Sequence, residues 1–160
     1  MITNNKKNTR IMAIDYGDAR TGVAVSDESA TLTGDAWVIH EKRPKVLAKT
    51  ILDEAKARGV GTIVVGFPKN MDGSVGFRAE ASETFANKLR QLMEIETETR
   101  SQLQPESDDI NIVLWDERLT TMMAGRLLSD VGKRGKKRKS SLDAVAASLI
   151  LESYLASKSG

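Results

Sequence analysis

The segment that most constrains the fold is residues 10–27, which read R-I-M-A-I-D-Y-G-D-A-R-T-G-V-A-V-S-D. Two short apolar runs, at 11–14 and 23–25, flank a polar bend with a glycine at each end. This pattern predicts two strands joined by a tight turn. Asp15 follows directly on the first apolar run, where an unpaired charge is costly to bury. Its carboxylate therefore either caps the turn through backbone N–H groups or binds a cation.

The rest of the chain alternates between apolar runs and segments whose apolar residues have helical spacing. The apolar runs predict further strands at 32–39, 62–65 and 110–115. The helical spacing predicts helices at 44–58, at 74 to about 98, from 120 or 121 to about 131, and at 140–155. In the second of these helices we expect a core-facing apolar stripe of Phe77, Ala81, Phe85, Leu89 and Leu92.

The order of these elements predicts the fold class. Three strands come first, followed by helix, strand, helix, strand and two helices, which indicates an α/β protein with a mixed five-stranded sheet flanked by helices. The first three strands would form an antiparallel meander, and helical crossovers would add the later strands in parallel. With 160 residues and no repeat, we expect one domain at 10–156, a disordered tail at 1–9 and a C-terminal tail at 157–160.

The composition excludes several classes of function. The chain has no cysteine, so it can form neither a disulfide framework nor a thiolate metal site. His40 is its only histidine, and a surface or packing position suits it better than general-base chemistry or a serine triad. The sequence has no apolar run of the roughly 20 residues that a membrane helix needs, and no signal-peptide pattern at its start. We therefore expect a cytoplasmic protein.

Four carboxylates stand at the ends of predicted elements. Asp15 ends the first strand, Asp116 and Glu117 follow the last strand, and Asp143 lies in the first turn of the last helix, on its packed side. Functional sites in open α/β sheets gather at the carboxyl ends of strands. Converging carboxylates repel one another, and their oxygens suit Mg²⁺ or Mn²⁺. Two such ions about 4 Å apart can activate a water and stabilise the leaving oxygen in phosphodiester hydrolysis.

Each carboxylate also has a simpler interpretation. Ser140 and Asp143 have the spacing of a capping box, in which Asp143 would only serve the helix N-terminus. Asp116 and Glu117 fit surface charges in a strand-to-helix loop, and Glu117 with Arg118 fits a weak local ion pair. The spacing alone leaves these alternatives open.

The distribution of charge is more informative than the net charge of +2. Acidic residues crowd the segment 94–109, whereas the segment 133–139 is almost wholly basic. The basic segment fits a solvated linker, but its place just before Asp143 favours contacts that hold a polyanion over the metals. Its cations are Lys133, Arg134, Lys136, Lys137, Arg138 and Lys139. Further candidates for phosphate contacts, on loops at the same predicted edge, are Arg20, Lys69, Asn70 and Arg118.

Four sequence blocks together resemble the YqgF/RuvX family, whose members are described as pre-16S rRNA nucleases and as Holliday-junction resolvase-like. In chain order the blocks are I-D-Y-G-D-A-R-T-G-V-A-V-S-D, G-F-P-K-N-M-D-G-S, D-E-R-L-T-T-M-M-A and L-D-A-V-A-A-S-L-I-L-E-S-Y-L. The resemblance extends from residue 10 to about residue 155. It implies an RNase H-like fold and a role in maturing the 5′ end of 16S rRNA in bacteria, on free precursor or on a ribosomal particle. It also implies that Asp15, Glu117 and Asp143 bind the metal, with Asp116 in reserve.

The leading hypothesis is thus a metal-dependent endonuclease that acts on structured RNA. Three alternatives remain. The first is a nucleic-acid-binding assembly or transcription factor that does not cleave. The second is a DNA Holliday-junction resolvase. The third is nucleotide phosphotransfer, because the I-D-Y-G turn resembles the first phosphate loop of the actin/hexokinase superfamily. The family resemblance also singles out Gly66 to Pro68, since many RNase H-like nucleases carry another carboxylate at that point of the fourth strand.

Overall fold

The first two strands form the hairpin expected from the sequence. In the computed structural model, which describes residues 9–101, 110–118 and 139–159, β1 (Arg10–Asp15) pairs antiparallel with β2 (Thr21–Ser26). Asp15 lies opposite Gly22 in this pair. The turn between them is closed by Thr21, whose hydroxyl and the Gly17 backbone lie 3.4 Å apart in two hydrogen-bond contacts. The turn therefore has its own hydrogen bonds.

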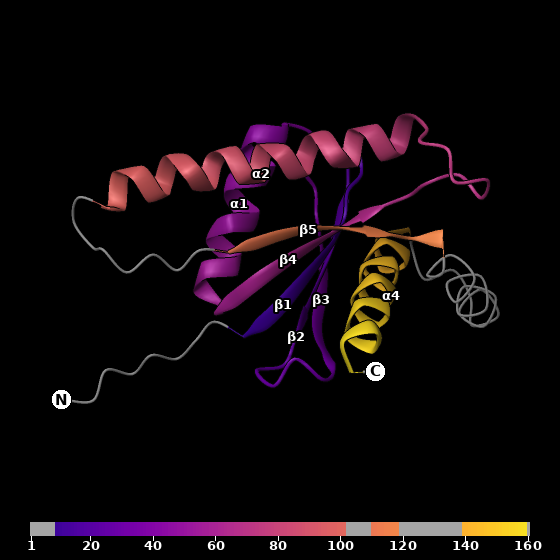
Figure 1. The fold of residues 1–160 in the computed structure, drawn as a ribbon, viewed down its shortest axis with the longest axis horizontal. Coiled ribbons are helices and arrows are strands. Elements are labelled where there is room, and N and C mark those ends of the chain that lie inside the picture. The colour runs from indigo at the N-terminus through magenta and orange to yellow at the C-terminus, as the bar shows by residue number, and fades with distance from the viewer. Residues whose placement is uncertain (1–8, 102–109, 119–138, 160) are drawn as a thin grey trace.

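The remaining strands complete a mixed sheet in the order β3-β2-β1-β4-β5. β3 (Thr33–Ile39) pairs antiparallel with β2. α1 (Pro44–Ala57) leads to β4 (Val60–Phe67), which is parallel to β1. α2 (Phe77–Ser101) leads to β5 (Asn111–Asp116), which is parallel to β4. The predicted α/β class, with an antiparallel meander and parallel additions, is confirmed (Figure 1).

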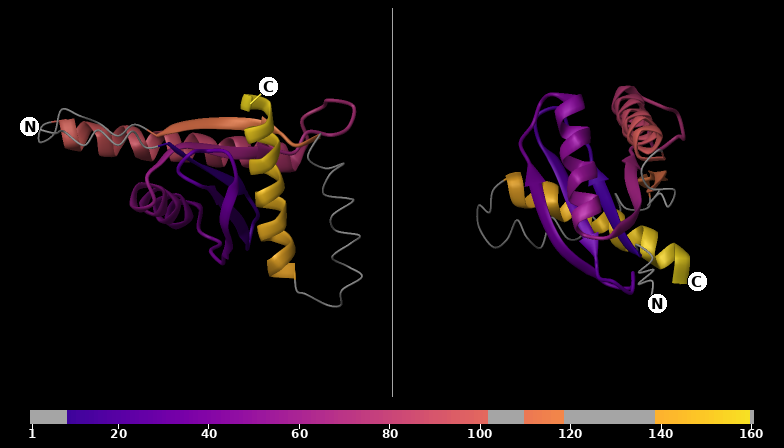
Figure 2. Two further views of the ribbon diagram at one scale, coloured as in Figure 1. Left: turned by 90° about the horizontal axis from the view of Figure 1, so that it is seen from below. Right: turned by 90° about the vertical axis from the view of Figure 1, so that its left-hand side faces the viewer.

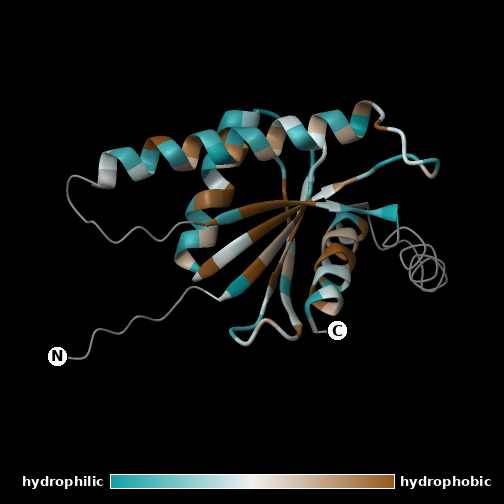
Figure 3. Ribbon diagram, in the orientation of Figure 1, coloured by the Kyte–Doolittle hydropathy of each residue, from teal (hydrophilic) through white to brown (hydrophobic). Residues whose placement is uncertain are grey.

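Helices cover the two faces of the sheet unequally. One face packs against α1 and α2 through a large apolar cluster that includes Met12, Ile14 and Phe85. The other face packs against α4 (Lys139–Ser159), which crosses the strands (Figure 2), through a smaller cluster that includes Ala13 and Ile150. Hydrophobic residues are concentrated on the strands and on the inner sides of the helices (Figure 3). Successive β1 residues alternate between the two clusters, as the twofold period of a strand requires.

Two aromatic contacts fix elements that border the carboxyl edge of the sheet. Tyr16, just after β1, stacks on Phe85 of α2 with ring centroids 4.5 Å apart. Trp115 of β5 meets Tyr154 of α4 edge to face at 5.3 Å, and its indole N–H donates to the Ser153 hydroxyl at 3.1 Å. Such aromatic pairs hold their elements in specific orientations. The β1–β2 turn is thereby tied to α2, and β5 to α4.

Two predictions about helix α2 need correction. The helix begins at Phe77, three residues later than expected, and Phe77 is 81% exposed. Phe85 and Leu89 of the predicted stripe are buried, but Phe77 is not part of it. The physical reason is that the buried face of the helix runs through Ala79, Ser82 and Phe85, and Phe77 lies off this face.

The start of α4 also differs from the expectation. The helix begins at Lys139, so Asp143 lies in its second turn and no acidic residue stands in the first. The capping-box interpretation of Ser140 and Asp143 is therefore wrong. The predicted helix at about 120–131, the basic segment at 133–138 and part of the acidic segment, at 102–109, lie outside the described residues. No helix among the described residues is long and apolar enough to cross a membrane.

Candidate active site

The parallel strands bring the predicted carboxylates to one edge of the sheet. β1 ends at Asp15 and β5 ends at Asp116, with Glu117 next in the chain. Between these strands runs β4, in which Val65 lies opposite Ile14 and Gly66 lies opposite Trp115. Asp15 thus ends β1 and Glu117 follows β5, and these two strands lie on either side of β4 and its Gly66.

Asp15 is partly buried, on the face of the sheet that α4 covers. Burial raises the pKa of its carboxyl group to about 6. The positive charge of Arg78 acts to lower this pKa, and the negative charge of Asp143 acts to raise it. Asp15 therefore lies within electrostatic reach of both side chains, and it becomes protonated at a higher pH than an ordinary aspartate.

Glu117 is buried more deeply than a loop residue normally is. Burial raises the pKa of its carboxyl group to about 7, and the neighbouring charge of Asp15 raises it further. Arg78 again opposes the shift, while Asp116 adds to it. The Glu117 carboxylate lies against the backbone of Gly66, in the space that a β-carbon there would fill. A glycine at this point of β4 leaves room for the carboxylate that β5 delivers.

Asp143 reaches the same edge from α4. The helix approaches β2 so closely that the Asp143 backbone carbonyl lies where a β-carbon on Gly22 would be. Gly22 is the residue paired with Asp15, so Asp143 stands over the end of β1. The Arg20 guanidinium, from the β1–β2 turn, lies 3.7 Å from the Asp143 carboxylate. Both side chains are about one-third exposed, so this ion pair is weak.

Asp116 has a different environment from the other three carboxylates. Arg118 holds it in a bidentate ion pair, with its Nε 3.1 and 2.9 Å from the two carboxylate oxygens and its Nη2 2.7 Å from Oδ2. The Arg118 backbone N–H also donates to Asp116. Hydrogen bonds from Arg118 lower the pKa of Asp116. Within the described residues, the local ion pair of Arg118 is therefore with Asp116 and not with Glu117, the partner that the sequence suggested.

The predicted nucleic-acid contacts gather around the same edge as far as they are described. Lys69 and Asn70 lie on the β4–α2 connection, and the Lys69 ammonium stands 5.7 Å from the centre of the Phe67 ring. Arg118 lies against Gly73 of that connection, with its Nη1 3.3 Å from where a β-carbon would be. Residues Lys133, Arg134, Lys136, Lys137 and Arg138 lie outside the described residues, and Lys139 is the first residue of α4.

Arg78 is a site residue that the sequence did not reveal. It lies in the first turn of α2 and is exposed, yet its charge acts on both Asp15 and Glu117. A single arginine near a helix start has no distinctive spacing, so nothing in the pattern singled it out. It supplies positive charge to both carboxylates and so opposes the repulsion from Asp143 at Asp15 and from Asp116 at Glu117.

The carboxylates at this edge of the sheet are suitable ligands for a hard divalent cation, but they do not form a complete metal-binding group in the described residues. Carboxylate oxygens are the ligands that Mg²⁺ and Mn²⁺ prefer. A cation would also relieve the repulsion that raises the pKa of Asp15 and of Glu117. Among residues 9–101, 110–118 and 139–159, however, no group of three or more acidic or histidine side chains stands ready to hold a metal ion.

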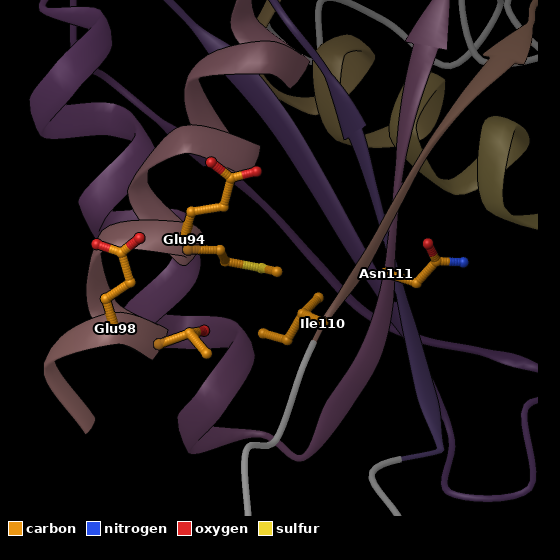
Figure 4. Close-up of a pocket in the computed structure, with 6 residues that line it drawn as sticks. Glu94, Glu98, Ile110 and Asn111 are labelled. Carbon is orange, nitrogen blue, oxygen red and sulfur yellow. The ribbon is translucent and has the colours of Figure 1, made fainter. Parts of the chain in front are cut away.

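A pocket lies at the opposite edge of the sheet. It has a volume of about 500 Å³ and is formed where α2 ends and β5 begins (Figure 4). Its lining includes Met93, Ile110 and the acidic pair Glu94 and Glu98. Glu94 and Glu98 belong to the acidic segment noted in the sequence, whose first part is thus the end of α2. The negative charge and the distance along β5 from Glu117 separate this pocket from the candidate active site.

Comparison with known proteins identifies the family. The family model described as "RuvX: Holliday junction resolvase" matches residues 9–157. The chain belongs to the RuvX family. RuvX is a nuclease family, so nucleic acid is the class of substrate to which the edge of carboxylates and cations corresponds.

Other RuvX proteins are similar over almost their whole length. A protein of Geobacillus thermodenitrificans is 44% identical over 154 residues, covering 93% of this chain and 99% of the relative. One of Acetivibrio thermocellus is 38% identical over 150 residues, covering 93% and 96%. Both carry the name "putative pre-16S rRNA nuclease". The predicted family resemblance is therefore confirmed.

Solved structures place the fold among the RNase H-like resolvases. The RuvC protein of T. thermophilus, in complex with a Holliday junction, superposes with a TM-score of 0.51 at 11% identity, covering 95% of this chain and 96% of that one. A Fowlpox virus resolvase with junction DNA gives 0.50 at 11% identity, covering 93% and 98%. At these identities the likeness concerns the fold, and it confirms the RNase H-like architecture.

Proposed function

We propose that this RuvX protein is a divalent-metal-dependent endonuclease that hydrolyses phosphodiester bonds during 5′-end maturation of pre-16S rRNA. The observation that carries the proposal is the pair of buried carboxylates, Asp15 and Glu117, at one edge of an RNase H-like sheet. Both have a raised pKa, to which the charge of Asp15 contributes at Glu117 and the charge of Asp143 contributes at Asp15. The names of the RuvX relatives supply the RNA substrate.

In this proposal Asp15, Glu117 and Asp143 hold the metal, which is Mg²⁺ or Mn²⁺, and Asp116 is the reserve ligand. When bound, the ion supplies the charge that activates a water and stabilises the leaving oxygen. Asp15 and Glu117 bring carboxylates into a partly dry environment, where their attraction for a cation is stronger than in water. Asp143 joins them when its loose ion pair with Arg20 opens.

The cations at the rim hold the RNA. We expect Lys69 and Arg118, together with Arg20 once it leaves Asp143, to contact phosphates near the carboxylates. Asn70 is engaged in the β4–α2 connection and shapes it. The basic segment from Lys133 to Lys139 adds sequence-independent attraction, so affinity should fall steeply with salt. Bacterial rRNA is processed in the cytoplasm, and the proposal places the protein there.

The first experiment compares cleavage of a 16S precursor fragment by the native chain and by Asp15→Asn, with Mg²⁺, with Mn²⁺ and with EDTA. Asp18→Asn is the matched control, because Asp18 is an exposed carboxylate in the same turn. A DNA four-way junction is tested in parallel. The expected result is metal-dependent cutting of the RNA by the native chain and by Asp18→Asn, and none by Asp15→Asn. Equal cutting by all three proteins would exclude Asp15 from the reaction.

A second candidate is a nucleic-acid-binding assembly factor that does not cleave. The observation that favours it is the incomplete metal-binding geometry among the described residues. This candidate predicts tight, salt-sensitive RNA binding that Asp15→Asn leaves intact, without cutting under any metal condition. Preferential cutting of the DNA junction would instead favour the resolvase activity after which the family is described.

A further inference from the structure

Three large apolar side chains stand at the surface of the connection between β4 and α2 and at the first residue of α2. Met71 is 71% exposed, Val75 is 47% exposed and Phe77 is 81% exposed. The other exposed large hydrophobic residues of the described chain are scattered over a turn, α1 and the distant half of α2. Half of the exposed apolar side chains are thus concentrated within seven residues. We define Met71, Val75 and Phe77 as the apolar tip.

The backbone that carries the apolar tip is ordered by its own hydrogen bonds. Asn70 N–H donates to the Ser74 carbonyl at 3.0 Å, and Gly73 N–H donates to the Asn70 carbonyl at 2.8 Å. The Asp72 carboxylate accepts from the Ser74 N–H at 2.9 Å and from the Ser74 hydroxyl at 2.6 Å. These bonds close the turn on itself. Met71, at its centre, therefore points away from the core in a preorganised turn.

The apolar tip borders the candidate active site on two sides. Its turn contacts Arg118 at Gly73, and Arg118 follows Glu117 directly in the chain. Phe77 is followed directly by Arg78, whose charge acts on both buried carboxylates. An exposed aromatic ring thus precedes, by one residue, an arginine whose charge acts on both carboxylates.

The surroundings of the tip point to a nucleotide rather than to an apolar protein surface. Lys69, Arg78 and Arg118 are the cations on its flanks. A nucleic acid fits an aromatic ring surrounded by cations, because its phosphates can contact the cations while one of its bases stacks on the ring. Only an unpaired base offers its face, since both faces of a base inside a duplex are covered by its neighbours.

We propose that Phe77, aided by Met71, stacks against an unpaired base of the RNA whose phosphate lies at the carboxylates. The inference rests on the proposed function and deepens it, because it names the substrate class. The favoured substrate has an unpaired base next to the scissile phosphate, and a continuous duplex is a poor substrate. Base–aromatic stacking tolerates any base, so the apolar tip should distinguish unpaired from paired bases but should not distinguish one base from another.

The experiment measures binding in the Asp15→Asn background, which removes cleavage from the readout. The probes are two RNA hairpins, one with a bulged 2-aminopurine and one with an added uridine opposite it, so that the base is paired. Phe77→Ala should weaken binding of the bulged hairpin by about 5- to 100-fold, the range that loss of one stacked base produces. It should also abolish quenching of 2-aminopurine fluorescence. Binding of the paired hairpin should change less than about twofold, because it presents only phosphates.

Two further variants control for structure. Phe77→Trp keeps an aromatic face and should retain both affinity and quenching. Ile95→Ala removes another exposed apolar side chain from the same helix and should have no effect on either hairpin. Phe77 is exposed, so its loss should leave the thermal unfolding midpoint within about 2 °C of the parent.

The outcomes separate this inference from the proposed function. Equal losses on both hairpins, or no loss on either, would overturn the stacking role. A change in oligomeric state of Phe77→Ala with unchanged RNA binding would overturn it in favour of a protein interface. Selective loss on the bulged hairpin would support it even if the native chain cleaved no RNA, in which case only the nuclease proposal would fail.

Discussion

The carboxylate of Glu117 occupies the space beside Gly66 that any larger residue would take for its β-carbon. Gly66 of β4 leaves a space at the sheet edge, and the side chain of Glu117, which follows β5, fills it. This relationship gives a physical reason why β4 carries no carboxylate of its own at that point. An acidic residue in place of Gly66 would compete with Glu117 for the same volume.

Replacing Gly66 by alanine should therefore disturb the site more than the fold. The new methyl group would meet Glu117 Oε1 and, at 2.8 Å, Ile150 Cδ1. We expect the free energy of unfolding to fall by about 1–3 kcal/mol, as overpacking typically costs. Cleavage should fall by about tenfold or more, because the Glu117 carboxylate has to move. Thermal unfolding and the RNA cleavage assay measure the two effects.

The matched control for this variant is Gly76→Ala. A β-carbon there would meet only the Asn70 side chain, at 3.3 Å or more. Its stability and activity should stay close to those of the native chain. Full activity in Gly66→Ala would show that the position of Glu117 next to Gly66 does not matter for the reaction.

Glu96 should contribute to stability by joining α1 to α2. Lys49 Nζ lies 3.2 Å from its carboxylate, and Lys56 makes a second ion pair with it. Burial acts to raise the pKa of Glu96, but these hydrogen bonds outweigh it and the pKa is lowered. A carboxylate whose pKa is lowered in the folded state stabilises the fold at pH values above its ordinary pKa. This stabilisation is lost as the pH falls through the lowered pKa. Glu96→Gln should thus cost about 0.5–1 kcal/mol near pH 7 and nothing near pH ~3.

Chemical denaturation at the two pH values tests this prediction. Asp53→Asn serves as the control, because it removes only an exposed pair between Asp53 and Lys49 within α1. A loss that persists unchanged at low pH would show that Glu96 acts through packing and not through charge.

The stability of the metal-free protein should fall as pH rises from about 5 to about 8. Asp15 and Glu117 have pKa values raised to about 6 and about 7. The folded state therefore holds their protons more tightly than the unfolded state, and the stability that this brings is present below their ordinary pKa values and lost as pH passes the raised ones. Glu117→Gln should remove part of this pH dependence and stabilise the metal-free chain near pH 8 by about 1–2 kcal/mol. Thermal unfolding between these pH values, with EDTA present, is the measurement.

Much of the fold could be read from local patterns, because each pattern reports the burial of one element. The apolar runs of β1 and β2 and the helical spacing around Leu47 and Ile51 reflect faces that are buried in the structure. The position of Asp15 at the end of an apolar run likewise marked it as unusual, and the structure shows a partly buried acid with a raised pKa.

The remaining features depend on contacts between elements that are distant in the sequence, and the spacing of residues within one element does not reveal such contacts. Phe77 precedes Ala81 and Phe85 at four-residue spacing, but the buried face of α2 begins at Ala79, and Phe77 is exposed. Asp143 fits a helix cap by spacing, but α4 already includes Lys139 and Asp143 lies in its second turn. The influence of Arg78 on the carboxylates, and the spaces left by Gly22 and Gly66, arise only when β1, β2, β4, α2 and α4 meet.

Arg78 should determine the pH range in which the enzyme works. Its charge opposes the rise in the pKa of both Asp15 and Glu117, so its removal lets both pKa values rise further. In Arg78→Gln, ionised carboxylates are then available only at higher pH. We expect activity to fall by about three- to tenfold at pH 7 and to approach the native value near pH ~9. Cleavage rates across this range, at saturating metal, test the shift. Arg78→Lys should restore much of the native profile, and Lys88→Gln, on the same helix, should leave it unchanged. A loss of equal size at every pH would instead assign Arg78 to substrate binding alone.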